Sequence, residues 1–189
     1  MPKLGIEPLR RAALIDATIH EIGSHGSLDV TVSQIARRAG MSSALAHHYF
    51  GAKDQMFLAA MRHLLRLYAA AIRGALVMAQ TPKQRVEAIV RGSFASDNFH
   101  PEVVAAWMHF YVLAQSSEAA NRLLRVYQGR LRSNLTHALR PMTDDAPARA
   151  EMIAALIDGI YLRQSLRPTP DMDSAVALVL RALPTEPPK

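Results

Sequence analysis

The sequence predicts an all-α protein of about nine helices, and three observations indicate this. Apolar residues recur at three- and four-residue spacing through most of the 189 residues, which gives each helix one apolar face. Ala, Leu and Met, which are good helix formers, dominate the long segments. Helix-start and helix-stop signals such as Thr81-Pro82 and Pro168-Thr-Pro170 divide the chain into segments of helical length, and no stretch alternates as a strand would.

The N-terminal part predicts three helices, of which the last two form a helix-turn-helix. The first is expected over residues 7–22, where the breaker Gly23-Ser-His-Gly26 follows. Thr31 is a good N-cap for a short second helix, and Ser42 is one for a third. Gly40 lies where the chain must leave the second helix, a position that often needs a positive φ. The apolar residues expected to hold the two short helices are Val32, Ile35, Ala36, Ala39, Leu45 and Phe50.

Six further helices are expected in the rest of the chain. Proline and capping residues place them near residues 53–78, 82–96, 101–117, 118–140, 144–167 and 171–183, with a frayed tail at 184–189. We therefore expect a helix-turn-helix DNA-binding domain over residues 1–52 and a helical regulatory and dimerisation domain over residues 53–189. No flexible linker separates the two, so the long fourth helix could transmit a movement between them.

Composition excludes several classes of protein. Half of the residues are apolar, so a sizeable core can form. The chain has no cysteine, which excludes disulfides and thiolate metal sites and fits a reducing cytoplasm. No signal sequence and no apolar run of the roughly 20 residues that a membrane span needs is visible. We expect a cytoplasmic protein without membrane contact.

The short third helix has the composition of a DNA-reading helix. Leu45 and Phe50 anchor it from behind, while small and polar side chains occupy its opposite face. Such a helix can enter the major groove, where Ser43 can hydrogen-bond to base edges and Ala44 can contact a thymine methyl group. The net charge of +6 suits a polyanion. Charge alone does not prove binding, because most of the positive excess lies in the C-terminal part.

The candidate DNA contacts divide into residues that read bases and residues that bind the backbone. His47 and His48 can reach bases or phosphates, and the sequence does not separate these roles. Lys53 begins the fourth helix, where its ammonium group and the helix N-terminus both favour a phosphate; Arg10 and Arg11 are further backbone candidates. Solvated charges, or partly buried histidines, are the simpler alternative. The predicted DNA contacts are Thr31, Gln34, Ser42, Ser43, Ala44, His47, His48, Tyr49 and Lys53.

The chain resembles the TetR family of bacterial repressors, from its first helix through Tyr49-Phe50 and Lys53-Asp54. Within that family it is similar to the BetI type, the choline-responsive repressors of glycine betaine synthesis. The segments that carry this closer likeness are residues 1–5, 11–17, 34–40, 130–135, 154–159 and 162–163. The resemblance implies a repressor of double-stranded operator DNA in which Tyr49 contacts a phosphate and a choline-like effector causes release. Residues 44–47 and 107–112 depart from the BetI pattern.

A homodimer is expected, because one helix-turn-helix unit contacts too few bases for high specificity. A two-fold dimer that reads a palindromic operator solves this. The predicted eighth and ninth helices have broad apolar faces, and small residues such as Gly159 permit close approach. The alternative is that these faces only cover the protein's own core. The residues predicted to form the dimer interface are Ile153, Leu156, Ile157, Ile160, Val176 and Val179.

The chain after residue 53 is larger than a DNA reader needs, which favours a pocket for an effector. Trp107 and Tyr111 lie four residues apart, and Phe110 lies three from Trp107, so the rings share one helix face. An aromatic cage with a nearby acid can hold a quaternary ammonium ion. Ordinary core packing is the simpler alternative, and a lipophilic or acyl ligand is another. The predicted effector residues are Trp107, Phe110, Tyr111, Phe94, Asp97 and Tyr161, with Glu102 and Asp158 as further acids.

No motif indicates an enzyme. The sequence has no Gly-rich phosphate loop, no nucleophile elbow and no His-Glu-x-x-His, and no two of its eight histidines lie three or four residues apart. We therefore expect no catalytic residue, metal site or cofactor. A non-specific DNA-compacting protein is a further rival, but it would need a more basic face and no large apolar second half.

Overall fold

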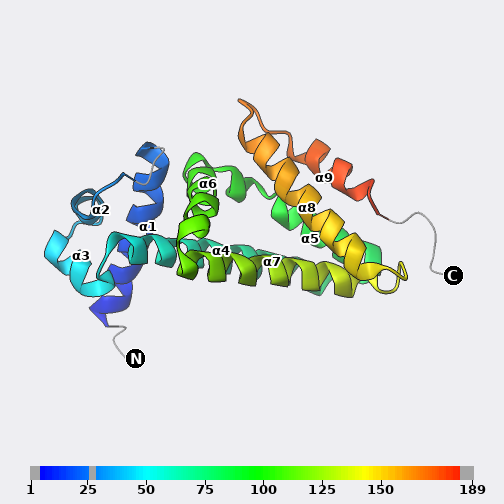
Figure 1. The fold of residues 1–189 in the computed structure, drawn as a ribbon, viewed down its shortest axis with the longest axis horizontal. Coiled ribbons are helices and arrows are strands. Elements are labelled where there is room, and N and C mark those ends of the chain that lie inside the picture. Colours follow the sequence, from blue (N-terminus) through cyan, green and yellow to red (C-terminus); the bar gives the residue numbers. More distant parts are fainter. Residues whose placement is uncertain (1–4, 26–28, 184–189) are drawn as a thin grey trace. The chain divides into compact units, whose positions relative to one another are not determined.

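The structure, a computed structural model, describes residues 5–25 and 29–183, and Figure 1 shows that the regular elements in them are helices. The expected frayed tail at residues 184–189 lies outside the described part. The all-α prediction is confirmed, and no helix of the described residues is both long and apolar enough to cross a bilayer. The elements found there are α1 (Ile6–His25), α2 (Val32–Arg38), α3 (Ser43–Phe50), α4 (Lys53–Met78), α5 (Pro82–Ser93), the 3-10 helix η1 (Ser96–Phe99), α6 (Pro101–Ser116), α7 (Glu118–Leu139), α8 (Ala146–Ser165) and α9 (Met172–Leu180).

The residues form two compact units by their contacts. The first unit extends to Leu65 and includes His100–Arg122, so it holds α1, α2, α3, α6 and the first half of α4. The second comprises Arg66–Phe99 and the residues from Leu123 onward. Helices α4 and α7 each run from one unit into the other. The expected domain border between residues 52 and 53 falls at the start of α4 and stays a prediction.

The helix-turn-helix forms as its capping residues predict. Thr31 Oγ1 accepts a hydrogen bond from the backbone N–H of Gln34 at 3.2 Å, and the Gln34 side chain accepts one from the N–H of Thr31 at 2.7 Å, which is a reciprocal capping box. Ser42 Oγ accepts from the N–H of Leu45 at 3.2 Å and so starts α3. Gly40 has a φ of +67°, the left-handed backbone that ends α2 and turns the chain toward α3.

Apolar side chains from several helices hold the first unit together. Leu14 and Ile22 of α1, Ile35 of α2 and Phe110 of α6 are all buried. Helix α1 packs against both α2 and α6, and α3 packs against α2. Burial of these side chains stabilises the unit by about 1.5–3 kcal/mol for each large residue. Helix α1 is therefore the common support of the helix-turn-helix and of α6.

The expected helix break at Gly23 is wrong, because α1 continues to His25. Gly23 lies where α6 comes closest to α1: a Cβ atom on it would overlap the backbone and side chain of Glu102. Glycine is therefore required here for the packing of two helices and not for a turn. Gly26, the other half of the expected breaker, lies outside the described residues.

The second unit has a core of its own. Helix α9 packs against both α5 and α8. Helix α5 ends at Ser93 and not near residue 96, because the side-chain amide of Asn98 donates to the carbonyl oxygens of Gly92 at 3.1 Å and Ser93 at 3.3 Å. These bonds satisfy carbonyl groups that a further helical turn would otherwise use. Buried side chains of this core include Ile72, Ile89, Leu135, Ile153 and Val179.

Replacing Gly23 by Ala is expected to destabilise the protein, although Ala is the better helix former. The added methyl group must displace Glu102 and the start of α6, and such overpacking costs about 1–3 kcal/mol of unfolding free energy. The matched control is Gly74→Ala inside α4, where nothing lies within 4 Å of the added Cβ atom; that change should stabilise by up to about 1 kcal/mol. Urea unfolding measures both, and effects of the same sign would contradict the packing argument.

Candidate nucleic-acid interface and effector residues

Helix α3 presents small and polar side chains to solvent, as its sequence predicts. Its exposed residues are Ala44, His47 and His48, whereas Ala46 is buried. Ser43 is half-buried, and its hydroxyl donates to Ser33 Oγ of α2 at 3.0 Å. Ser42 caps the helix with its own oxygen. Ala44, His47 and His48 are thus accessible from solvent. Ser42 and Ser43 instead make hydrogen bonds that hold α3 in place.

The two histidines of α3 have different partners. His47 donates from Nδ1 to the carbonyl oxygen of Gly51, so any further hydrogen bond of this ring is made by Nε2. The His48 ring meets the ring of Tyr49 edge-on, with the ring centroids 5.4 Å apart. The exposed ring of His47 is thus tied to the end of α3, and that of His48 to its neighbour Tyr49.

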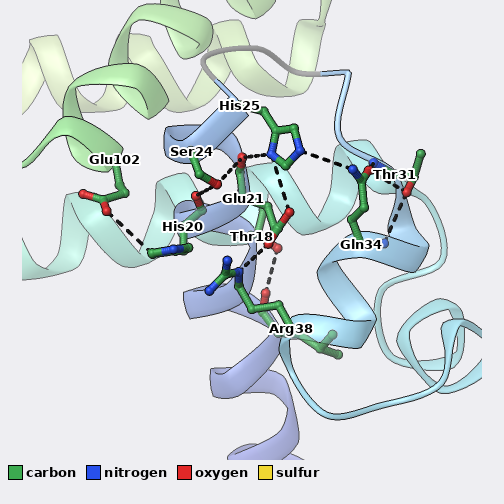
Figure 2. Close-up of polar contacts among 10 residues, drawn as sticks. Thr18, His20, Glu21, Ser24, His25, Thr31, Gln34, Arg38 and Glu102 are labelled. Carbon is green, nitrogen blue, oxygen red and sulfur yellow. Dashed lines mark hydrogen bonds and ion pairs between the residues drawn. The ribbon is translucent and has the colours of Figure 1, made fainter.

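Figure 2 shows how α1 holds the start of α2. The side-chain nitrogen of Gln34 lies 3.3 Å from Nε2 of His25. His25 in turn donates from Nδ1 to the carbonyl oxygen of Glu21 at 3.0 Å. Gln34 also closes the capping box with Thr31. Thr31 and Gln34 are predicted to contact the DNA backbone. Hydrogen bonds within the protein fix the positions of both side chains.

Glu21 carries a buried carboxylate that our reading of the sequence missed. Its side chain is 8% exposed, Arg38 at the end of α2 donates to it from Nε, and His25 Nδ1 lies 3.6 Å from its other oxygen. The Arg38 hydrogen bond holds the pKa of Glu21 below its ordinary value, against the opposing effect of burial. Spacing could have revealed this residue, because it follows buried Leu14 and Ala17 at helical intervals.

Arg11 of α1 reaches the end of α3. Its Nε donates to Glu7 Oε1 at 3.0 Å, and its guanidinium carbon lies 5.6 Å from the centroid of the Tyr49 ring and 5.1 Å from that of Phe50. Both distances fall within the roughly 6 Å range of cation–π attraction. The sequence indicated Arg11 only as a possible phosphate contact. Lys53, as predicted, is the first residue of α4.

The predicted effector residues fall into two groups, one in each unit. In the first unit, the Trp107 ring lies 6.0 Å from the rings of both Phe110 and Tyr111, measured between centroids. Trp107 and Phe110 are buried and Tyr111 is half-buried. Glu102, one of the further acids, lies 3.6 Å from Nδ1 of His20. The structure thus brings the three rings together on α6, with the burial expected of core residues.

Phe94, Asp97 and Tyr161 belong to the second unit. The Phe99 ring lies 6.4 Å from Phe94 and 4.9 Å from Tyr161, measured between centroids. The Tyr161 hydroxyl donates to the carbonyl oxygen of Asn98 at 2.7 Å. Burial raises the pKa of Tyr161, so this phenol stays a neutral donor. Asp97 is exposed, whereas the rings of Phe94, Phe99 and Tyr161 are buried or half-buried.

Tyr68 and Asp158 add a polar element to the second unit. The Tyr68 hydroxyl and Ser93 Oγ share a hydrogen bond at 2.9 Å, and the Tyr68 and Tyr127 rings meet edge-on at 5.6 Å. Burial, and more weakly the charge of Asp158, raise the pKa of Tyr68. The charge of Asp158 therefore acts on Tyr68, which the spacing of residues in the sequence could not indicate.

The residues predicted to form the dimer interface lie mostly in the core of the single chain. Their spacing turns them toward the core of the single chain, where α8 packs against α9. Leu156 is half-buried. The dimer interface itself stays a prediction. The five that are at most 8% exposed are Ile153, Ile157, Ile160, Val176 and Val179. The residues that α8 exposes at helical spacing on its other side are Met152, Ala155, Gly159 and Leu162.

Known proteins match the chain over almost its full length. A family described as bacterial regulatory proteins, tetR family, matches residues 14–60, and one described as BetI-type transcriptional repressor, C-terminal, matches residues 82–186. The HTH-type transcriptional regulator BetI of Agrobacterium fabrum is 56% identical over 182 residues, which are 95% of this chain and 88% of the relative.

Solved structures share the fold. A TetR transcription regulator from Haloarcula marismortui superposes with a TM-score of 0.84 at 21% identity, covering 92% of this chain and 96% of that chain. A protein from Saccharomonospora viridis, solved in complex with choline, gives a TM-score of 0.79 at 19% identity, covering 89% and 92%. At these identities the likeness establishes the fold alone.

Replacing Glu21 by Gln is expected to lower stability and to remove part of its acid dependence. The folded pKa lies below the ordinary value of 4.5, so the stabilising contribution is fully present above pH 4.5 and is lost as pH falls through the folded pKa. The melting temperature of the wild type should therefore fall more steeply below pH 4.5 than that of the variant. Thermal unfolding across the acid range measures this difference.

Two further variants sharpen this pH experiment. Arg38→Met removes the partner and should flatten the acid dependence in the same way. Glu7→Gln removes a carboxylate whose side chain is 60% exposed, and it should leave the slope close to that of the wild type, because an exposed pair contributes little. A wild-type slope in Glu21→Gln would show that this carboxylate is not linked to folding.

Proposed function

We propose, starting from the fact that this chain belongs to the BetI type of TetR-family transcriptional regulators, that it binds a palindromic operator as a homodimer and that a quaternary ammonium compound such as choline releases it. The family consists of transcriptional regulators and not of enzymes. The observation that carries the proposal is the exposed face of α3, which α1 and α2 hold in place.

The proposed DNA contacts follow the exposure and the hydrogen bonds of the helix-turn-helix. Helix α3 enters the major groove with Ala44 and His47 toward the bases. Tyr49 and Lys53 bind phosphates beside the groove, the latter at the N-terminus of α4, where the helix dipole also favours an anion. The remaining proposed contacts with the DNA backbone lie at the starts of α2 and α3 and in the last turn of α3. They are Thr31, Gln34, Ser42, Ser43 and His48.

The proposed dimer uses the outward face of α8. TetR-family regulators bind DNA as dimers, and a two-fold axis matches a palindromic site. Leu162 is 43% exposed and Met152 39% exposed, and they lie on the same side of α8 as exposed Ala155 and Gly159. Small residues between two large apolar ones let a second helix approach closely. Leu178 of α9, which is 53% exposed, extends the apolar surface.

The proposed effector is a small cation, for which the second unit offers aromatic rings and an acid. Cation–π attraction contributes about 0.5–2 kcal/mol per ring, and a carboxylate balances the charge. Half-buried Asp158 is favoured over exposed Asp97 because its charge acts on half-buried Tyr68, whose ring packs on that of Tyr127. The proposal is supported by the Saccharomonospora viridis protein of the same fold, which was solved in complex with choline. Trp107, Phe110 and Tyr111 of α6 remain proposed effector contacts of the first unit.

Release is proposed to be a population shift. One state of the dimer sets its two α3 helices about 34–36 Å apart, which is one turn of DNA. The effector binds better to a state with another separation, and the operator affinity falls by the difference between the two binding energies. Helix α4 can carry the displacement, because it begins at Lys53 beside α3 and continues without a break to Met78.

The proposal is tested with DNA fragments that the protein selects from genomic DNA. It should bind a selected fragment at least about 10³-fold more tightly than unrelated DNA, and choline should weaken that binding by about fivefold or more. Asp158→Asn should keep the operator affinity and lose the choline response, whereas Asp97→Asn should keep both. Fluorescence anisotropy at fixed salt measures all of these affinities.

The same titration distinguishes the rival ligands. Release by acyl compounds or lipophilic drugs, with no effect of choline, would show that the effector is apolar and not a cation. The proposed repressor function would stand in that case. Equal binding to selected and unrelated DNA would remove operator recognition altogether. Loss of the choline response in Asp97→Asn but not in Asp158→Asn would identify Asp97 as the carboxylate that balances the charge of the effector.

Leu162→Asp is expected to weaken the homodimer without unfolding the chain. The substitution places a charge in the proposed interface, where desolvation of an unpaired carboxylate is costly. The matched control is Val112→Asp in α6, where the replaced side chain is 62% exposed; it should leave the dimer intact. Sedimentation velocity reports the oligomeric state, and a dimeric Leu162→Asp protein would place the interface elsewhere.

A further inference from the structure

Arg11 joins α1 to the last turn of α3. Its guanidinium contacts the rings of Tyr49 and Phe50, and its Nε binds the carboxylate of Glu7 one turn earlier in α1. The Arg11 side chain is 43% exposed, so it lies at the surface beside the face that α3 presents to solvent. The base and phosphate contacts predicted for α3 do not explain why Arg11 binds both these rings and Glu7.

We infer that Arg11 is a positioning residue for operator binding: it holds the Tyr49 ring, and with it the end of α3, in the orientation that DNA contact requires. The inference rests on the proposed operator binding, in which Tyr49 contacts a phosphate. A phosphate contact fixes the register of a protein on the duplex. A misplaced Tyr49 would therefore also displace the neighbouring base contacts of α3.

The end of α3 needs such support because the helix has little of its own. It has only eight residues, of which Ala46 alone is buried, and helices this short are not stable without tertiary contacts. Tyr49 and Phe50 are half-buried. The chain then leaves the helix at Gly51 with a φ of +75°. The guanidinium on the two rings therefore supplies a contact that α3 cannot supply internally.

The geometry requires an arginine and not merely a positive charge. A guanidinium is planar, stacks on aromatic rings and still has an Nε donor for a carboxylate. Here Glu7 takes that donor, and the pair at i and i+4 on one helix face fixes where the cation lies. A lysine ammonium is a compact, strongly hydrated charge that cannot face both rings and the carboxylate together.

A direct phosphate contact is the rival role for Arg11, and two substitutions separate the roles. Arg11→Lys keeps the charge and loses the stacking plane, whereas Arg11→Gln loses both. If Arg11 binds a phosphate, Arg11→Gln should reduce the slope of log affinity against log salt by about 0.9, and Arg11→Lys should bind nearly as the wild type does. If Arg11 positions Tyr49, both variants bind the operator more weakly with an unchanged slope.

The experiment measures operator affinity of the full chain at several salt concentrations. We expect the dissociation constant of Arg11→Lys to rise about fivefold, the scale of a lost cation–π contact of modest strength, with the salt slope of the wild type. Arg122→Lys and Arg122→Gln are the matched controls and should bind the operator as the wild type does, since Arg122 of α7 also pairs with a carboxylate four residues earlier, that of Glu118, and its side chain is 72% exposed. Thermal unfolding of each variant establishes that the measurements are made well below its melting temperature.

Three outcomes would overturn the inference. Wild-type affinity in Arg11→Lys together with a reduced slope in Arg11→Gln would assign a phosphate contact. A lower melting temperature with unchanged operator affinity in both variants would assign a purely structural role. If the wild type itself selects no DNA site, the proposed operator binding fails, and the inference fails with it; the first two outcomes leave operator binding standing.

Discussion

The ion pair between Glu21 and Arg38 fixes where the helix-turn-helix lies on α1. A buried carboxylate that loses its partner is strongly destabilising, so the end of α2 must stay where Arg38 reaches Glu21. Helix α3 follows α2 through the short turn at Gly40, whose positive φ sets the direction of the chain. The ion pair between α1 and α2 therefore determines which face α3 turns outward, although no residue of α3 takes part in it.

Helix α1 makes contacts with both helices of the helix-turn-helix. Near one end Arg11 contacts the rings at the end of α3, and near the other His25 and Glu21 hold α2. The same end of α1 packs against α6, because Gly23 leaves room for the backbone of Glu102. Helix α6, which carries the buried aromatic group of the first unit, thus rests on the helix that orients α3. Interiors packed this closely transmit a displacement instead of absorbing it.

The sequence predicted what depends on local chemistry and missed what depends on packing between helices. Thr31, Gly40 and Ser42 act within a few residues of themselves, so the helix-turn-helix could be predicted with its caps. The residues around Gly23 predict a helix break, because nothing local shows that α6 passes there. The dimer residues stay a prediction for a related reason: apolar periodicity marks a buried face but does not say whether the same chain or a second one covers it. Arg11 looked like a phosphate ligand because its ring partners are far away in sequence.

Arg11 and Arg38 also explain why net charge is a weak guide to the interface. Both arginines lie near α2 and α3, yet each binds a carboxylate of α1, Glu7 or Glu21. Their charges are thus partly neutralised within the protein and orient other residues. The residues that α3 exposes, Ala44, His47 and His48, include no lysine or arginine. In the proposed complex with operator DNA, Ala44 and His47 read bases through methyl contacts and hydrogen bonds, which depend on geometry. Selectivity in that complex comes from holding a few groups in register, which is the task that we assign to the buried and stacked charges of α1.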